Sequence, residues 1–315
     1  MAGGQERVLR RRIKSVQSTK KITRAMELIA GSRIVKAQAR VHAAVPYANG
    51  ITDVVRNLAA AGAGGKNPLL AEPAKLERVL QVPITADRGL CGGYNTTVIR
   101  ATEGEMKKFA DQGAGYALVT VGRRAQSYFQ YRNYEIGASF EGFSQEPTYE
   151  DARAIARWIT PRFLAGEFDL VQLVYTRFIS SGSQELVVRP LMPLGDDDDF
   201  DPKAAGNAGD ADGAEKVSAD YEFEPSPDGI LDDLLPRYAE ARIYAALLNA
   251  AASEHAARQR AMKAATDNAD ELIRTLSRVM NRARQDAITN EIMEIVGGAE
   301  AMNAGVGVAD EAPNA

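Results

Sequence analysis

Apolar residues in the last quarter of the chain recur at alternating gaps of three and four. This stripe consists of Met262, Ala265, Ala269, Leu272, Leu276, Val279 and Ala283. Such spacing forms the seam of a coiled coil, where one helix face packs against a partner. The pattern slips near Ala287, as at a stutter, and resumes at Ile288, Ile292, Ile295, Ala299 and Met302.

No Gly or Pro, the residues that most often end a helix, occurs between Arg237 and Val296. The spacing therefore predicts one helix of about sixty residues. At ~1.5 Å per residue it would span roughly 90 Å, several times the length of an ordinary globular helix. A helix of this length needs a partner helix, and it points to a mechanical or scaffolding role.

The first forty-five residues show the same spacing. One stripe is formed by Leu9, Ile13 and Val16, and a second by Ile22, Met26, Ala30, Ile34, Ala37, Val41 and Ala44. Pro46 is the first strong helix breaker and is expected to end the helix. Because neither narrow stripe is stable alone, we predict that the two terminal helices pack as an antiparallel pair.

Between the two helices the pattern changes to alternating strands and helices. Strands are predicted at 78–85, 116–121, 170–178 and 185–194, and helices at 96–110, 123–132 and 148–164. This order is typical of a doubly wound, Rossmann-like α/β domain. The predicted fold class is thus α/β plus a long antiparallel coiled coil. The coiled coil is discontinuous (1–60 and 228–303), the α/β domain spans 77–195, a flexible acidic insertion spans 196–220 and a disordered tail spans 304–315.

The composition excludes several classes of protein. No stretch approaches the eighteen apolar residues of a membrane span, and the arginine-rich start lacks the apolar core of a signal peptide. The lone Cys91 fits a reducing compartment, and the two histidines, His42 and His255, lie far apart. A zinc site or a Cys-His nucleophile is therefore not expected. We expect no cofactor, no metal and no catalytic residue.

Charge is distributed unevenly along the chain. Residues 1–40 carry eleven Lys/Arg against two acids, and residues 196–228 carry twelve acids against two lysines. A basic helix can bind nucleic acid or an anionic membrane. Here the basic residues alternate with a heptad seam rather than with stacking aromatic residues. An acidic protein partner or a solvated helix face is favoured, and no nucleic-acid partner is expected.

The sharpest short motif is the turn Thr85–Asn95, TADRGLCGGYN, which follows a predicted strand and precedes a predicted helix. In α/β folds this position often binds phosphate at a helix N-terminus. The motif is neither G-x-G-x-x-G nor a Walker motif, so a structural turn or a partner-contact loop is favoured over a nucleotide site. The Asp87-Arg88 pair suits a protein partner that accepts charge-assisted hydrogen bonds.

Three segments together resemble the gamma subunit of the F-type ATP synthase. They are RRIKSVQSTKKITRAMELIA (11–30), DRGLCGGYN (87–95) and ITNEIMEIVGGA (288–299), the last preceded by AMKAATDN (261–268). Their order and spacing match those of the family over nearly the whole chain. The resemblance implies a central-stalk rotor that couples proton flow through a membrane ring to ATP synthesis in the catalytic alpha/beta hexamer. Its partners would be the alpha, beta and epsilon subunits and the rotor ring, and it would be peripheral on the cytoplasmic side of the cell membrane, without a span of its own.

The resemblance also assigns contact residues. Those matching contacts with the alpha/beta hexamer are Arg10, Ile13, Met26, Asp87, Arg88, Gly89, Leu90, Cys91, Asn95, Arg284, Gln285 and Thr289. Those matching the end near the rotor ring and epsilon are Arg237, Tyr238 and Glu240. The acidic insertion departs from the family pattern and is either a braking segment or a plain solvated insertion. The alternative functions are a free coiled-coil adaptor and a nucleotide-binding α/β protein.

Overall fold

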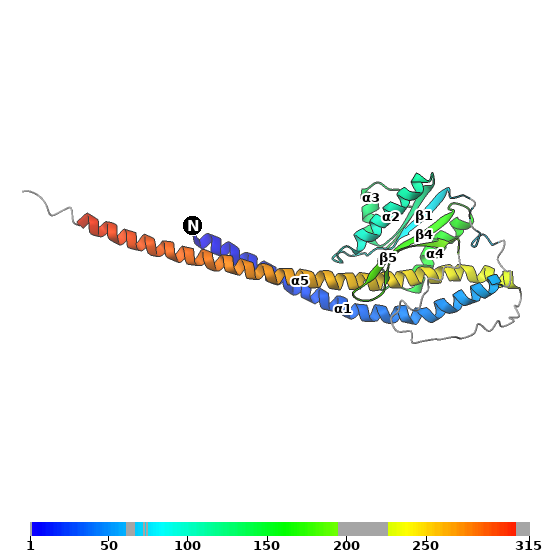
Figure 1. Cartoon of the computed structure of the whole chain (residues 1–315), viewed down its shortest axis with the longest axis horizontal. Coiled ribbons are helices and arrows are strands. Elements are labelled where there is room, and N and C mark those ends of the chain that lie inside the picture. Colours follow the sequence, from blue (N-terminus) through cyan, green and yellow to red (C-terminus); the bar gives the residue numbers. More distant parts are fainter. Residues whose placement is uncertain (1, 61–66, 72, 74, 195–225, 307–315) are drawn as a thin grey trace, which may run out of the picture. The chain divides into compact units, whose positions relative to one another are not determined.

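The computed structural model of the chain describes residues 2–60, 67–71, 73, 75–194 and 226–306. The helices and strands, in chain order, are α1 (Ala2–Ala60), β1 (Arg78–Pro83), α2 (Tyr94–Asp111), β2 (Gly115–Val121), α3 (Arg123–Tyr131), β3 (Ala138–Phe140), α4 (Tyr149–Leu164), β4 (Leu170–Phe178), β5 (Gln184–Met192) and α5 (Pro227–Val306) (Figure 1). The predicted acidic insertion 196–220 lies outside the described residues. So do residues 307–315 of the predicted tail, whereas residues 304–306 belong to α5.

The chain divides into two compact units. The shaft unit comprises residues 1–26 and 262–315, and the α/β unit comprises residues 27–261. Helices α1 and α5 each contribute to both units. The predicted fold class is confirmed: two long terminal helices and an α/β sheet formed by the middle of the chain.

The α/β unit contains one five-stranded sheet in the order β3-β2-β1-β4-β5. The first four strands in this order are mutually parallel, and β5 runs antiparallel to β4. The short β3 was not predicted, because three residues are too few to show a period of two. Strand order reverses between β1 and β4, which are neighbours although they are far apart in sequence.

Helices cover both faces of the sheet. On one face, Ile99 and Met106 of α2 and Phe129 of α3 pack on Leu118 of β2. On the other face, α4, the end of α1 and the start of α5 share the largest core with β1, β2, β4 and β5. The C-terminal part of α1 and the N-terminal part of α5 thus belong to the same hydrophobic core as the sheet.

Helix α1 does not end at Pro46 as predicted but continues through it to Ala60. A proline in a helix interior costs about 3 kcal/mol, since it removes one backbone hydrogen bond. The turns beyond it bury Ile51, Val55 and Leu58 in the main core, and each such side chain contributes roughly 1.5–3 kcal/mol. Packing therefore outweighs the local penalty. The same holds at Pro236 in α5, where Leu231 and Leu235 are fully buried.

The seam of the shaft unit keeps five of the seven predicted stripe positions between Met262 and Ala283 and departs from the stripe at the other two. The buried or half-buried positions of α5 in this unit are Met262, Ala265, Thr266, Ala269, Asp270, Ile273, Leu276, Ser277, Met280, Ala283 and Ala287. The predicted Leu272 and Val279 are 40% and 46% exposed, and Ile22 of α1 is 61% exposed. Within this set, Met262, Thr266, Ala269, Ile273, Leu276, Met280, Ala283 and Ala287 follow each other at gaps of four and three, without the predicted slip near Ala287.

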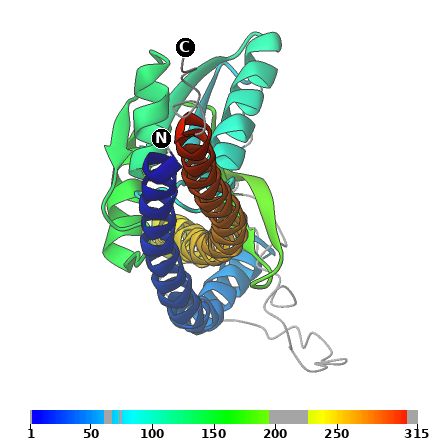
Figure 2. The same cartoon turned by 90° about the vertical axis from the view of Figure 1, so that its left-hand side faces the viewer.

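Polar residues in the seam explain the error at Ile22, whereas at Leu272 and Val279 the seam uses the adjacent apolar Ile273 and Met280. On α1 the seam of the shaft unit is Leu9, Ile13, Val16, Lys20 and Thr23. The Thr23 and Thr266 hydroxyls lie 2.8 Å apart in a buried hydrogen bond, and Lys20 forms an ion pair with Asp270. A pattern that counts only apolar residues misses these positions and shifts to apolar neighbours on the solvent side. The pairing itself is antiparallel, as predicted (Figures 1 and 2).

The predicted stripe and the observed seam predict different effects of leucine truncation in α5. Leu276→Ala removes a side chain that is 8% exposed and should destabilise the full chain by about 2 kcal/mol. The matched control Leu272→Ala removes one that is 40% exposed and should cost under about 1 kcal/mol. Urea denaturation of both variants measures the difference. A larger loss for Leu272→Ala would contradict the observed register.

Candidate functional site

The turn Thr85–Asn95 lies at the carboxyl end of β1, where the strand order of the sheet reverses. Ile84 N–H donates to the Val174 carbonyl of β4, and Thr85 N–H donates to the Val121 carbonyl of β2, each at 2.8 Å. The chain then turns into α2, which begins at Tyr94. In open α/β sheets ligands bind in the crevice at this reversal point. The turn thus occupies the position where this class of fold most often carries a site.

Asp87 holds the turn to two other loops of the α/β unit. Its carboxylate accepts backbone N–H groups of Arg123, Gly142 and Ser144 at 3.0–3.1 Å. Partial burial alone would raise the pKa of Asp87, but these hydrogen bonds outweigh it and leave the pKa below its ordinary value. The carboxylate is already engaged within the chain, so Asp87 shapes the turn rather than offering a free acceptor to a partner.

Asn95 closes the turn from its other end. Its side-chain oxygen accepts Ala86 N–H at 2.8 Å, and its amide nitrogen donates to the Cys91 sulfur at 3.1 Å. Cys91 is 1% exposed, and burial raises the pKa of its thiol. Leu90 adopts the left-handed region at φ 64° and is 61% exposed. Arg88 and Leu90 are the side chains of this motif that are exposed for contact.

Helix α5 occupies the crevice beside the turn. Ser253 donates its hydroxyl to the Thr176 carbonyl of β4 at 2.9 Å, and Tyr94 donates its hydroxyl to the Ala250 carbonyl of α5 at 3.2 Å. Residues 250–256 of α5 are all buried. A nucleotide could enter this crevice only by displacing α5, so the geometry disfavours the alternative prediction of a nucleotide site at the turn.

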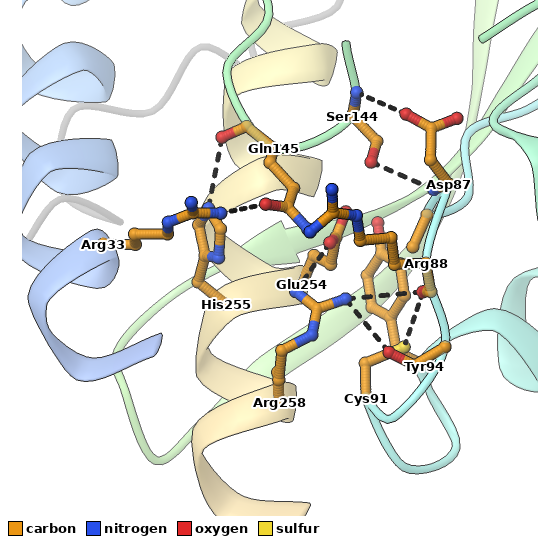
Figure 3. A network of polar contacts seen from close by, with 12 residues as sticks. Arg33, Asp87, Arg88, Cys91, Tyr94, Ser144, Gln145, Glu254, His255 and Arg258 are labelled. Carbon is orange, nitrogen blue, oxygen red and sulfur yellow. Dashed lines mark hydrogen bonds and ion pairs between the residues drawn. The ribbon is translucent and has the colours of Figure 1, made fainter. Parts of the chain in front are cut away.

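A buried ion pair on α5 binds the backbone of the turn (Figure 3). Arg258 Nη1 lies 2.7 Å from Glu254 Oε1, and these two side chains are 8% and 1% exposed. Arg258 Nη2 also donates to the carbonyls of Arg88 and Gly89 at 3.4 and 3.3 Å. The turn therefore directs carbonyl oxygens toward a cation. This is the reverse of a phosphate-binding loop, in which amide groups point at an anion.

The charge of the pair is balanced within the network. Burial raises the pKa of Glu254, while the Arg258 guanidinium and a hydrogen bond from Ser144 act in the opposite direction. Ser144 also accepts Asp87 N–H at 3.0 Å, which links the pair to the other end of the turn. The network thus joins α5, the turn and the loop after β3.

His255 extends the network toward α1. Its Nε2 donates to the Gln145 carbonyl at 3.1 Å, and the side chain of Gln145 accepts a hydrogen bond from Arg33 of α1. His255 Nδ1 is buried without a hydrogen-bond partner in the described part of the chain. Burial, together with the charges of Arg258 and Arg33, lowers the pKa of His255 to about 4, against the opposing Gln145 hydrogen bond and Glu146 charge. The imidazole is neutral at neutral pH.

The structure distributes the other predicted contact residues between the two units. In the shaft unit, Ile13 is buried in the seam and Met26 is half-buried. Arg10 is exposed and pairs with Glu6 at 2.6 Å. Arg284, Gln285 and Thr289 are exposed on α5.

The residues predicted near the rotor ring lie on α5 in the α/β unit and differ in their exposure to solvent. Arg237 is exposed, but Tyr238 is 5% exposed and belongs to the main core. Glu240 accepts the Tyr149 hydroxyl at 2.9 Å and lies 3.8 Å from Arg153 Nε. Of the three, Arg237 is the side chain free to meet a partner.

Sequence reasoning missed the side chains that hold the turn from α5, namely Glu254, His255 and Arg258. One signal was present: Glu254 and Arg258 stand four residues apart inside the alanine-rich run 250–257. An acid and a base at this spacing share one helix face. Because the rest of the run is apolar, that face is expected to be buried. The two charged side chains then need polar partners on the segment that packs against the face.

Comparison with known proteins places the chain in a family. A family model described as ATP synthase matches residues 5–302. A gamma chain of ATP synthase from Parafrankia sp. is 47% identical over 306 residues, covering 96% of this chain and 99% of the relative. The chain belongs to the ATP synthase gamma chain family. The gamma chains of Frankia casuarinae and Streptomyces coelicolor are 48% and 45% identical, each over at least 95% of both chains.

Solved structures of ATP synthases share the fold of this gamma-family chain. A chain of the Euglena gracilis mitochondrial enzyme matches with a TM-score of 0.68 at 19% identity, covering 99% of each chain. One from the Tetrahymena thermophila central stalk and ring matches with a TM-score of 0.57 at 24% identity, covering 78% of this chain and 99% of that one. Gamma chains are the central-stalk subunits of F-type ATP synthase, and this chain is a subunit of that membrane-bound complex. Among the described helices, none is both long and apolar enough to span a bilayer.

Proposed function

We propose that the chain is the rotor of its complex and transmits rotation between a proton-driven membrane ring and an alpha/beta hexamer. Proton flow would turn the ring, and the ring would turn the chain. The asymmetric shaft would then drive the three beta sites through different affinities, so that ATP is made in the hexamer. The observation that carries this proposal is the paired seam of α1 and α5 in the shaft unit of a gamma-family chain.

The end of α5 supports a contact with the hexamer. The hydrogen bond Thr23–Thr266 sets an antiparallel register in which α1 begins opposite about residue 287 of α5. From Ile288 to Met302 every residue of α5 is exposed, including Ile292 and Ile295 at 55% and 67%. Exposed apolar side chains on an unpaired helix fit insertion into a partner. Just before them, Arg284 offers a bidentate fork for a carboxylate, and Gln285 and Thr289 can donate or accept hydrogen bonds.

We further propose that the α/β unit serves as the foot, which would bind epsilon and the ring. Arg237 is the exposed candidate for this contact, while Tyr238 and Glu240 would act by shaping the helix around it. The exposed Arg88 and Leu90 of the turn would contact the hexamer. On this account the chain is peripheral, on the cytoplasmic side of the cell membrane.

Co-purification tests the proposal directly. A tagged chain recovered from detergent-solubilised membranes should bring down alpha, beta, epsilon and the ring protein together. A free coiled-coil adaptor would bring down other partners, and a nucleotide-binding protein would bind nucleotide as the purified chain. Recovery of the chain without alpha and beta would contradict the rotor proposal.

Met26→Lys should impair coupling more than folding. Met26 is half-buried on α1 in the shaft unit, and a cation there would form a new ionic contact that resists rotation next to a beta subunit. A contact of about 1.4 kcal/mol in the rotational barrier would slow synthesis roughly tenfold. ATP synthesis and hydrolysis in membrane vesicles measure the effect, with Met26→Leu as the volume-conserving control. Normal coupling in an assembled Met26→Lys complex would show that Met26 has no such role.

A further inference from the structure

The α/β unit contains a cavity beside the residues proposed to face the ring, since Arg237 and Glu240 belong to its lining. Its volume is about 790 Å³, and it lies between α1, α4 and α5. Ligand sites in proteins typically have volumes of roughly 300–1,000 Å³. Its lining residues all belong to the α/β unit. The cavity is thus large enough for a small organic molecule.

Small side chains account for the empty space. Five alanines from the two long helices line it: Ala43, Ala44, Ala48, Ala241 and Ala245. Pro236 adds a further apolar surface. These side chains are too short to fill the gap between the helices, which leaves an apolar floor.

Aromatic rings form the side walls. Tyr149 and Tyr244 meet edge to face with centroids 5.6 Å apart, and Tyr47 is 53% exposed at the opening. Such rings offer flat apolar faces with a polar end. A flat or extended apolar body would be held between them and the alanine floor.

The charged rim favours an anion. Glu240 is already matched by Arg153 and the Tyr149 hydroxyl, and Arg153 also pairs with Glu150. Two further guanidinium groups line the cavity, Arg40 and Arg237, and neither has an ion-paired or hydrogen-bonded partner in the described part of the chain. Asp233 is the one remaining carboxylate of the lining. Among the lining residues, three arginines therefore stand against two carboxylates, an excess of one positive charge, and Glu150 lies outside the lining.

We propose that this cavity binds a small organic anion with an apolar body and a single negative group. The body lies between the alanine floor and the tyrosine rings, and the anionic group is held by Arg40 and Arg237. Each lining residue is supplied by the chain itself, so this binding can be measured on the chain without its partners, although Arg237 is also the residue proposed to contact the ring.

Two probes of the same shape test the proposal: naphthalene-1-sulfonate, which is anionic, and naphthalene-1-sulfonamide, which is neutral. Isothermal titration of the full chain should show one saturable site that binds the sulfonate roughly tenfold more tightly, the difference that a charge-assisted contact supports. Arg40→Gln/Arg237→Gln should remove this preference and leave sulfonamide binding unchanged. The control Arg100→Gln/Arg132→Gln changes two exposed arginines outside the cavity and should preserve it.

A second variant tests the location of the site. Ala44→Phe would place a ring in the cavity and should abolish binding of both probes, while the circular dichroism spectrum and melting temperature show that the helices remain folded. Equal affinity for the two probes, a charge preference that survives Arg40→Gln/Arg237→Gln, or no saturable binding would each overturn the proposal.

Discussion

Arg258→Met should destabilise the full chain by about 3–5 kcal/mol, the cost of removing one partner from a buried ion pair. Glu254 is 1% exposed and would lose its cation, so it would have to bind a proton or remain as an unpaired buried charge. The carbonyls of Arg88 and Gly89 would lose their donor on α5 as well. A loss of this size is a large part of the 5–15 kcal/mol that typically stabilises a folded domain. Urea denaturation of the purified chain measures it.

A double variant separates two effects of Arg258→Met. One is the cost of leaving the Glu254 charge buried without a partner, and the other is the loss of the hydrogen bonds from Arg258 to the turn. In Glu254→Leu/Arg258→Met the charge is removed from both positions, and apolar residues of similar volume often replace a buried pair with little change in stability. We expect this variant to recover most of the lost stability. Hydrogen exchange at the amides of 86–95 should nevertheless stay faster than in the wild type, because the turn still lacks its donor. A single Arg258→Met variant within about 1 kcal/mol of wild type would show that the pair does not hold the turn.

His255 should make the chain lose stability as the pH falls from about 6.5 toward 4. Its pKa is lowered from the ordinary 6.5 to about 4 in the folded chain. Above pH 6.5 the imidazole is neutral in both states, and its contribution to stability is fully present. Between these values the unfolded chain binds a proton that the folded chain does not, so unfolding becomes more favourable. A shift of this size corresponds to about 3 kcal/mol between pH 6.5 and pH 4.

The measurement is the free energy of unfolding at a series of pH values for wild type and His255→Asn. The carboxylates titrate in both proteins, so the difference between the two curves isolates His255. That difference should change by about 3 kcal/mol over the window. His42→Asn alters an exposed histidine of α1 and serves as the control for the loss of an imidazole. Parallel curves for wild type and His255→Asn would mean that His255 takes up its proton in the folded chain as readily as in the unfolded one.

Much of the architecture could be predicted from apolar spacing, and its errors arise where spacing within one segment does not decide the packing. Strand β4 was predicted with its observed bounds, because most of its residues are apolar and buried. The helix seam was misplaced at Ile22, because Thr23 occupies the seam through a buried hydrogen bond with Thr266. It was also misplaced at Leu272 and Val279, where the seam uses the adjacent apolar Ile273 and Met280. The spacing of apolar residues along one helix cannot show that a polar residue there forms a hydrogen bond or ion pair with a polar residue on the other helix.

The candidate site was predictable only in part for a related reason. The turn Thr85–Asn95 stands out by its glycines and by its place after a strand. The partners of Asp87 do not, because Gly142 and Ser144 lie more than fifty residues further along the chain. The carboxylate that suggested contact with another protein therefore proves to bind backbone within its own unit.

The rotor proposal is tested most directly by watching the chain turn. Cys91 is the single cysteine, so a Cys91→Ala, Tyr131→Cys chain carries one thiol at a residue that is 84% exposed in the α/β unit. A bead is attached there after assembly with an alpha/beta hexamer fixed to a surface, and ATP is added. The proposal predicts unidirectional rotation of the bead that stops when ATP is exhausted. ATP hydrolysis at the normal rate with a stationary bead on an assembled complex would contradict it.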